Sequence, residues 1–488
     1  MRRLVVVENL KRWPLTLQGA EVVSARDYLV DPEYTGMRRA VVYNLCREYR
    51  YQSLGYYVSL LAAARGHRPF PDVATLQDLG SGQATKVVAG SLNELIQKSL
   101  ATIRADQFEV SIYFGRNLAK RHERLAREIF NAIPAPFLRA RFTKQAHWRL
   151  SHVRPIAGGD IPEAHRAFVI EQFERHFAST HSTLRRQELR YDMAILWRPD
   201  DAEPPSDAVA IRKIIKAAQQ EGFAARVIGP EDYGSVAEFD ALFIRETTAV
   251  DHHTYRFARR AEAHGLVVID DTASILRCTN KVFQDEIFTR HGVPTPRTLI
   301  VHGRNSREVE SAVGFPCVLK RPDSSFSLGV TKVASPQELE RELPSALLLS
   351  PLVIVQEWTP SAFDWRIGTL GGEALFACRY HMVRGHWQIA AGGTGTRRRY
   401  GRVEAVALEE VPPHVLDVAV RAARLMGDGL YGVDLKDVDG LALVMEVNDN
   451  PNIDSGNEDA VLKDELYAAI ARHFRQAVDR RGNEVVRA

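Results

Sequence analysis

Three oxygen-bearing side chains stand close together near the C-terminal end of the sequence. Asp434 lies in the segment 431–435, and Glu446 and Asn448 lie in the segment 443–448. If these segments form a β-hairpin, Glu446 and Asn448 share one face of their strand, because alternate residues point the same way. Two carboxylates and an amide oxygen suit Mg²⁺. The alternative is a hairpin with its charged faces in solvent, but two carboxylates among Val, Leu and Met are costly to bury without a cation.

Two lysines upstream of this hairpin are candidates for phosphate binding. Lys320 ends an apolar segment, where an unpaired ammonium group is unfavourable, and Lys281 begins a predicted helix. The loop 322–330 after Lys320 is rich in small and hydroxyl-bearing residues, among them Ser325, Ser327 and Gly329. Backbone N–H groups of such a loop can close over phosphates. For each lysine alone, the alternative is an ordinary surface position.

Another apolar strand ends in polar groups at Gln356, and Asp364 and Arg366 follow shortly after it. Gln356 and the main chain at the strand end could bind an adenine edge, and Asp364 could accept hydrogen bonds from ribose hydroxyls. Arg366 begins a strand expected to run near the hairpin, where a guanidinium would neutralise charge on a transferred phosphoryl group. The alternative for Asp364 and Arg366 is a surface pair.

The elements that must position these residues belong to the part of the chain after residue 190. Strand-like segments at 193–197, 225–228, 241–245 and 266–270 alternate with helical patterns, which predicts a small parallel sheet. Beyond a helix at 281–291, strand patterns with hairpin-length turns predict antiparallel sheets with flanking helices.

The predicted fold class is therefore α/β and α+β. Residues 1–150 also alternate strands and helices and form an α/β domain, residues 151–190 are a connector, residues 191–275 hold the parallel sheet, and residues 276–488 hold the antiparallel part.

In their order and spacing these residues resemble the ATP-grasp fold, most closely the RimK-type glutamate ligases. The resemblance assigns Lys281 and Lys320 to the nucleotide phosphates and Asp364 to the ribose. It implies two Mg²⁺ ions, with Mn²⁺ as a possible substitute, on Asp434, Glu446 and Asn448. The remaining assignments are an adenine-binding segment and two catalytic residues: Gln356, Glu357 and Trp358 for the adenine, and Arg366 and Asn450 for catalysis.

Two departures from the family pattern accompany the resemblance. The phosphate loop has only Gly329 where related ligases have several glycines, and an Arg-Ser-Asn element is replaced by His386, Trp387 and Gln388, of which only Gln388 is chemically similar to the asparagine. Residues 43–47 and 51–61 resemble the N-terminal domain of one RimK-like subgroup. This domain is either a packing or oligomerisation module or an acceptor-binding module.

The resemblance implies a carboxylate–amine ligase that uses ATP and Mg²⁺ and forms an acyl phosphate. One expected substrate is an amino acid, which the resemblance alone identifies as glutamate. The other is an amine-bearing amino acid, peptide or protein. The candidates for substrate binding are Arg245 and Thr248, at a strand's carboxyl end, and Arg397, in a basic loop. The alternative for the arginines is a solvated surface cluster. A homo-oligomer is also expected.

The charge and cysteine content of the chain restrict the class of protein and its compartment. The chain has 488 residues, with 64 Lys+Arg and 61 Asp+Glu, but residues 1–190 carry a net +11 and the rest a net −8. Four single cysteines, no export signal and no apolar stretch of membrane-spanning length predict a cytoplasmic protein without a membrane partner.

Two rival functions remain open. One is a nucleic-acid or ribosome-binding protein with a regulatory ATP site, which the spread of the basic charge disfavours. The other is a nucleotide-binding protein without ligase activity, which the intact acidic set disfavours.

Overall fold

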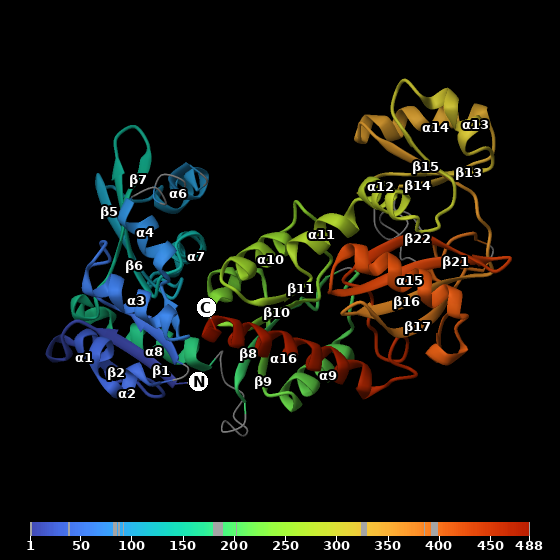
Figure 1. The fold of residues 1–488 in the computed structure, drawn as a ribbon. Coiled ribbons are helices and arrows are strands. Elements are labelled where there is room, and N and C mark those ends of the chain that lie inside the picture. Colours follow the sequence, from blue (N-terminus) through green and yellow to red (C-terminus); the bar gives the residue numbers. More distant parts are fainter. Residues whose placement is uncertain are drawn as a thin grey trace. The chain divides into compact units, whose positions relative to one another are not determined.

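The computed structural model describes all residues except 1, 38–39, 82–84, 86–87, 91, 179–188, 202, 324–328, 385, 392–398 and 488. The chain forms two compact units (Figure 1). The first contains Met1–Asp192, Gly229–Asp240 and Asp479–Ala488, and the second contains Met193–Ile228 and Ala241–Val478. Parallel and antiparallel sheets with flanking helices confirm the predicted α/β and α+β class.

The first unit contains a parallel sheet and an antiparallel sheet. The parallel sheet has the order β2-β1-β3-β4 and is formed by β1 (Arg2–Val7), β2 (Glu21–Ser24), β3 (Ala40–Asn44) and β4 (Arg68–Phe70). The antiparallel sheet comprises β5 (Gln107–Tyr113), β6 (Phe137–Lys144) and β7 (Trp148–Pro155). The helices are α1 (Ala25–Val30), α2 (Pro32–Thr35), α3 (Leu54–Ala64), α4 (Val73–Ser81), α6 (Asn93–Leu100), α7 (Glu123–Ala132) and α8 (Arg166–Ala178).

The predicted connector 151–190 is not a linker over most of its described length. β7 extends into it, and α8 follows, with Phe173 and Phe177 buried in the core of the first unit. Phe173 contacts Phe137 edge-on, with ring centroids 5.4 Å apart. The apolar positions Val169, Phe173 and Phe177 of α8 face the core, so this part of the predicted connector is an element of the first unit.

A segment from the predicted 191–275 domain also belongs to the first unit. The 3₁₀ helix η5 (Pro230–Glu238) packs against α7, where Gly234 lies directly on the Phe130 ring, leaving no room for a side chain. Glu238 Oε2 lies 2.9 Å from His176 Nε2. The domain boundary therefore does not follow the chain order that the alternation of elements suggested.

The second unit begins with the predicted four-stranded sheet. Its order is β11-β10-β8-β9, and β10 pairs in parallel with both β8 and β11. Its strands and helices are β8 (Tyr191–Leu196), α9 (Ala208–Gln220), β9 (Phe223–Ile228), β10 (Ala241–Ile244), α10 (His253–Ala263), β11 (Val267–Ile269) and α11 (Thr272–Thr279).

An antiparallel sheet of order β12-β15-β13-β14 follows in the second unit. Its strands are β12 (Thr298–Val301), β13 (Cys317–Lys320), β14 (Val330–Val333) and β15 (Val353–Glu357). The helices of this part are α12 (Lys281–His291), α13 (Val309–Ala312) and α14 (Pro336–Leu349). Gly292 ends α12 in the left-handed conformation, with a φ of 61°, as its sequence pattern predicts.

The second antiparallel sheet carries the hairpin and has the order β20-β17-β16-β21-β22. Its strands are β16 (Phe363–Leu370), β17 (Glu373–His381), β20 (Val403–Val406), β21 (Leu430–Val438) and β22 (Leu441–Asp449). α15 (Pro413–Met426) covers one face through an apolar stripe that includes Val415, Ala419 and Ala422. The short pair β18 (Ala390–Ala391) and β19 (Arg399–Tyr400) and the C-terminal helix α16 (Asp464–Arg487) complete the described strands and α-helices.

Candidate functional site

The hairpin β21–β22 places Asp434 opposite Glu446. Its two-residue turn is Asp439 and Gly440, with φ values of 52° and 81°, the left-handed conformation that tight hairpins need. Asn448 pairs with Gly432, and its Nδ2 lies 3.1 Å from Asp434 Oδ2 and 3.5 Å from Glu446 Oε1. The three side chains therefore lie on one face of the hairpin.

Arg366 lies on the neighbouring strand β16, directly opposite Asp434. Its guanidinium forms a two-point ion pair with that carboxylate, and the Nη2–Oδ2 distance is 2.8 Å. The close approach requires Gly432, because a Cβ there would lie 2.9 Å from Arg366 Cδ. Burial raises the pKa of Asp434 to about 6, against the opposing effect of Arg366.

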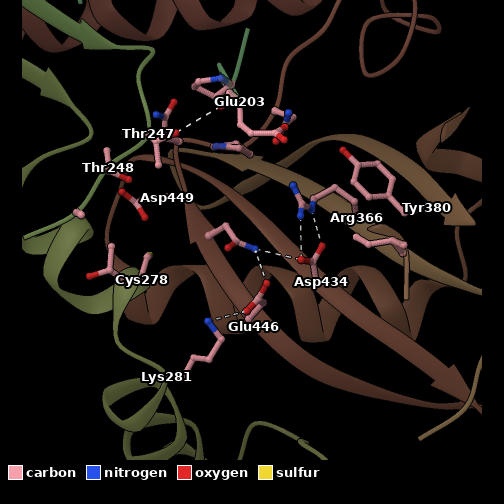
Figure 2. A pocket seen from close by; sticks show the side chains of 18 of the residues that line it. Glu203, Thr247, Thr248, Cys278, Lys281, Arg366, Tyr380, Asp434, Glu446 and Asp449 are labelled. Carbon is pink, nitrogen blue, oxygen red and sulfur yellow. Dashed lines mark hydrogen bonds and ion pairs between the residues drawn. The ribbon is translucent and has the colours of Figure 1, made fainter. Parts of the chain in front are cut away.

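Glu446 lies among three cations. Lys281 Nζ is 3.3 Å from Glu446 Oε2, so the first residue of α12 faces the hairpin. Burial works to raise the pKa of Glu446, but Lys281, Lys320 and Arg366 outweigh it and lower the pKa. Figure 2 shows a series of contacts that runs from Lys281 to Glu446, through the Asn448 amide to Asp434, and on to Arg366.

Lys320 ends β13 beside Gln356 of β15. Its Nζ donates a hydrogen bond of 2.7 Å to Gln356 Oε1, and Gln356 Nε2 donates to Thr298 Oγ1 at 3.1 Å. Burial lowers the pKa of Lys320 to about 8. In the protein alone, an amide oxygen therefore accepts the hydrogen bond that the sequence analysis assigned to a phosphate.

Other predicted nucleotide residues pair with side chains other than Asp434, Glu446 and Asn448. Glu357 pairs with Arg297, with Nη2 and Oε1 2.9 Å apart, and Trp358 stacks under Lys332, whose Nζ is 3.7 Å from the ring centroid. The Asp364 carboxylate lies 2.6 Å from Lys436 Nζ. Lys436 is a buried cation that sequence reasoning missed, because its strand position suggested no partner.

Gln388 and the loop residues complete the predicted nucleotide set. The backbone N–H of Gln388 donates to His386 Nδ1 at 3.1 Å, and its carbonyl accepts from Val383. Gly329 has a φ of 68°, the left-handed conformation that a glycine adopts without strain. Ser325, Ser327 and Arg397 lie outside the described residues.

A large pocket of about 2130 Å³ opens over the hairpin. Seven predicted residues line it: Lys281, Arg366, Asp434, Glu446, Asn448, Asn450 and Thr248. Lys320, Gln356, Glu357, Trp358, Asp364, Gln388 and Arg245 are not part of its described wall. The pocket thus joins the predicted metal and phosphate side chains to residues at the carboxyl end of β10.

Arg245, predicted to bind substrate, is instead fully buried below the pocket. Its guanidinium donates to Asn450 Oδ1 at 2.6 Å, to the carbonyls of Pro205 and Pro451 at 2.6 and 2.8 Å, and to Ser206 Oγ at 3.0 Å. These four acceptors leave it no role as a substrate ligand, and the expectation is corrected. Arg245 holds the loop after β22 against the parallel sheet.

Asp449 is a pocket residue that the sequence did not single out. It follows Asn448 at the end of β22, and its carboxylate is 9% exposed. The Thr248 hydroxyl donates a hydrogen bond to it, and burial raises its pKa to about 7. In Figure 2 Asp449 and Thr248 lie apart from the series that links Lys281 to Arg366.

The hairpin side chains fit a hard divalent cation by their chemistry. Asp434, Glu446 and Asn448 present only oxygen ligands once the Asn448 amide is turned, and all three line one pocket. Within the described ranges, no group of three or more His, Cys, Asp and Glu side chains is arranged to hold a metal. Two carboxylates and an amide leave coordination positions for water and phosphate oxygens.

Two family models match parts of this chain. Residues 278–470 match the RimK-like ATP-grasp domain, and residues 25–172 match the RimK-like ATPgrasp N-terminal domain. A probable alpha-L-glutamate ligase 1 of Shewanella amazonensis is 27% identical over 281 residues, which cover 53% of this chain and 89% of that protein. A probable alpha-L-glutamate ligase of Hydrogenovibrio crunogenus is 26% identical, with the same coverage.

Solved structures with partial similarity include D-alanine–D-alanine ligase from Bacillus anthracis complexed with ATP, at 15% identity and a TM-score of 0.46, covering 60% of this chain and 99% of that one. A RimK domain ATP-grasp protein from Sphaerobacter thermophilus has 17% identity and a TM-score of 0.46, covering 58% and 98%.

The chain carries an ATP-grasp domain, and the curated relatives named above are called ligases. It belongs to the RimK-like ATP-grasp proteins and carries their N-terminal domain, as the sequence resemblance implied. In the part of the chain that the structure describes, no helix is long and apolar enough to cross a membrane.

Proposed function

We propose that the protein joins a carboxylate substrate to an amine through an acyl phosphate, at the expense of ATP. The observation that carries the proposal is the convergence of Asp434, Glu446 and Asn448 with Lys281 and Arg366 on one pocket wall. Acidic oxygens beside two cations suit a triphosphate bound with divalent metal.

The predicted metal, phosphate and catalytic residues have distinct jobs in this proposal. Asp434, Glu446 and Asn448 would hold Mg²⁺, which supplies charge neutralisation at the nucleotide phosphates. Lys281 and Lys320 bind phosphate oxygens, and Arg366 offsets the negative charge that develops during transfer. Asn450 accepts from Arg245 through its Oδ1 and donates to the Glu246 carbonyl through its Nδ2, so it fixes the pocket wall at the end of β22.

The proposed reaction needs no nucleophile from the protein. A carboxylate oxygen of the donor attacks the γ-phosphorus, the bond to ADP breaks, and an acyl phosphate forms. The amine nitrogen then attacks the acyl carbon, inorganic phosphate leaves, and the nitrogen loses a proton. The buried thiol of Cys278, which lines the pocket, has a pKa raised by burial and takes no part as a nucleophile.

We propose an amino acid as one substrate and an amine-bearing amino acid, peptide or protein as the other. Glutamate is the first candidate, because the curated relatives named above are called alpha-L-glutamate ligases.

The test is a screen for ADP release with amino acids offered singly and in pairs, with detection of the amide by mass. We expect at least one combination to stimulate ADP release and to yield the matching amide. If no combination does so, ligation of free amino acids is refuted, and peptide acceptors are screened in the same assay.

Glu446→Gln tests the role of the hairpin within that assay. The variant should abolish turnover and remain folded, since glutamine preserves the shape of the side chain. Glu373→Gln, an exposed position at the start of β17, is the matched control and should behave as the unmodified protein. Full activity in Glu446→Gln would overturn the metal assignment.

A further inference from the structure

One side of the pocket lies away from the hairpin's metal-binding face. It is formed by the segment after β10, by α11 and by Asp449, and we call it the Asp449 side. Thr247, Thr248, Ala273, Leu276 and Cys278 line it. The carboxyl ends of parallel strands are where open α/β sheets bind ligands, so this side is well placed for a substrate.

The carboxylate of Asp449 is incompletely paired at this place. Asp449 is nine-tenths buried, and its Oδ2 atom has no hydrogen-bond partner among the described residues. A buried carboxylate oxygen without a donor is costly, so the position indicates a missing donor. Asn448, one residue earlier, points to the other face of β22 and bonds Asp434, so the two neighbours serve different sides of the pocket.

The charges around Asp449 are of its own sign. The carboxylate of Asp271 repels that of Asp449, and Asp449 in turn repels the carboxylate of Asp270. Among the described residues, no cation offsets this repulsion at Asp449. Arg277 lines the same side, but its Nη1 donates to the Met426 carbonyl at 3.0 Å. This side of the pocket therefore favours a positively charged group and disfavours a second carboxylate.

We propose that Asp449, held by Thr248, binds the protonated amino group of a substrate. The proposal deepens the proposed function and rests on it for the identity of the site. An ammonium group has three donors, and a carboxylate oxygen and the Thr248 hydroxyl can accept two of them. A metal ion would need several more oxygens than the apolar side chains of Ala273, Leu276 and Cys278 supply.

The proposal reverses the expected chemistry of substrate recognition. Arg245, a basic residue, was predicted to bind substrate, but it is buried and its donors are occupied, and the acidic side chain of Asp449 lines the pocket instead. The amino group thereby becomes the recognised feature, and analogues that lack it should be rejected because they leave Asp449 Oδ2 without a donor.

Thermal-shift measurements test this without requiring turnover. The full-length protein, with Mg²⁺ and a non-hydrolysable ATP analogue, is screened against the twenty amino acids and against their counterparts without the amino group, such as glutarate for glutamate. We expect one or more amino acids to raise the melting temperature of the unmodified protein, and their deaminated counterparts to have no effect.

Asp449→Asn should weaken binding of those amino acids about 10- to 100-fold, the effect of losing a hydrogen bond to a charged group. Its melting temperature without amino acid should equal or exceed that of the unmodified protein, because a neutral amide is cheaper to bury. Thr248→Val should weaken binding less. Asp439→Asn, in the exposed turn of the same hairpin, is the control and should bind normally.

Three results would overturn the proposal: equal binding by Asp449→Asn, equal binding of deaminated counterparts, or no stabilisation by any amino acid. Because binding is read separately from ADP release, failure of the ligase assay leaves this test standing. Where turnover is found, a rise in KM for the carboxylate donor or for the amine acceptor in Asp449→Asn shows which of the two carries the amino group.

Discussion

Replacing Arg245 distinguishes a structural anchor from a substrate ligand. In Arg245→Met the side chain keeps much of its volume but loses all of its donors. Four acceptors then lack partners: the Pro205 and Pro451 carbonyls, Asn450 Oδ1 and Ser206 Oγ. Each buried group left unpaired costs about 1–3 kcal/mol, and with partial relaxation we expect a total of about 3–5 kcal/mol.

For a unit of this size, that loss lowers the melting temperature by about 10 °C. Turnover should fall as well, because Arg245 positions Asn450 at the pocket wall. Calorimetry and the ADP-release assay measure the two effects. Arg256→Met, at an exposed position of α10, is the matched control and should change stability by less than about 0.5 kcal/mol.

Arg245→Lys should restore little, since an ammonium group cannot reproduce the guanidinium's fixed set of donors. The reasoning is refuted if Arg245→Met keeps the unmodified melting temperature and raises KM for one substrate alone. That pattern would return Arg245 to the substrate role expected from sequence.

Three further predictions concern the nucleotide side of the site. Because burial lowers the pKa of Lys320 to about 8, its charge is lost as pH rises from 7 to 9, and the Kd for ATP measured by calorimetry should increase. Lys320→Met should bind ATP weakly at every pH, and a pH profile in that variant equal to that of the unmodified protein would contradict the assignment. Lys436→Met leaves Asp364 without its cation and should lower the free energy of unfolding, measured by urea titration, by about 3 kcal/mol. Unchanged stability would show that the Lys436–Asp364 pair contributes nothing. Chelation by EDTA should stop ADP release, and added Mg²⁺ should restore it; persistence of turnover in EDTA would contradict the metal proposal.

The elements of the site were predictable from local pattern. Alternating apolar residues around a two-residue turn predicted the hairpin, and the register found places Asp434 and Glu446 opposite each other. Lys281 was placed correctly at a helix start, because Asn280 caps α12 and Gly292 ends it. The spacing of these residues also sufficed to suggest the family, which the domain matches confirm.

The partners of buried charges were not predictable in the same way. Nothing in the sequence around Lys436 indicates that it faces Asp364, 72 residues earlier. Arg245 looked like a ligand because it ends a parallel strand, yet the loop after β22 occupies its donors. Asp449 attracted no attention because it alternates with the predicted metal ligands, on the opposite face of its strand.

The sequence by itself determined the strands, helices and turns of this protein and the residue types able to bind phosphate and metal, because hydrophobic periodicity, capping and turn chemistry act over a few residues. Only the tertiary structure decided which faces meet. It placed α8 and η5 in the first unit, occupied the donors of Arg245 with internal acceptors, and left one carboxylate oxygen of Asp449 without a donor at a pocket. The reason is that a strand's pattern specifies which side is buried but not what covers it, and the pairing of buried charges depends on contacts between segments hundreds of residues apart.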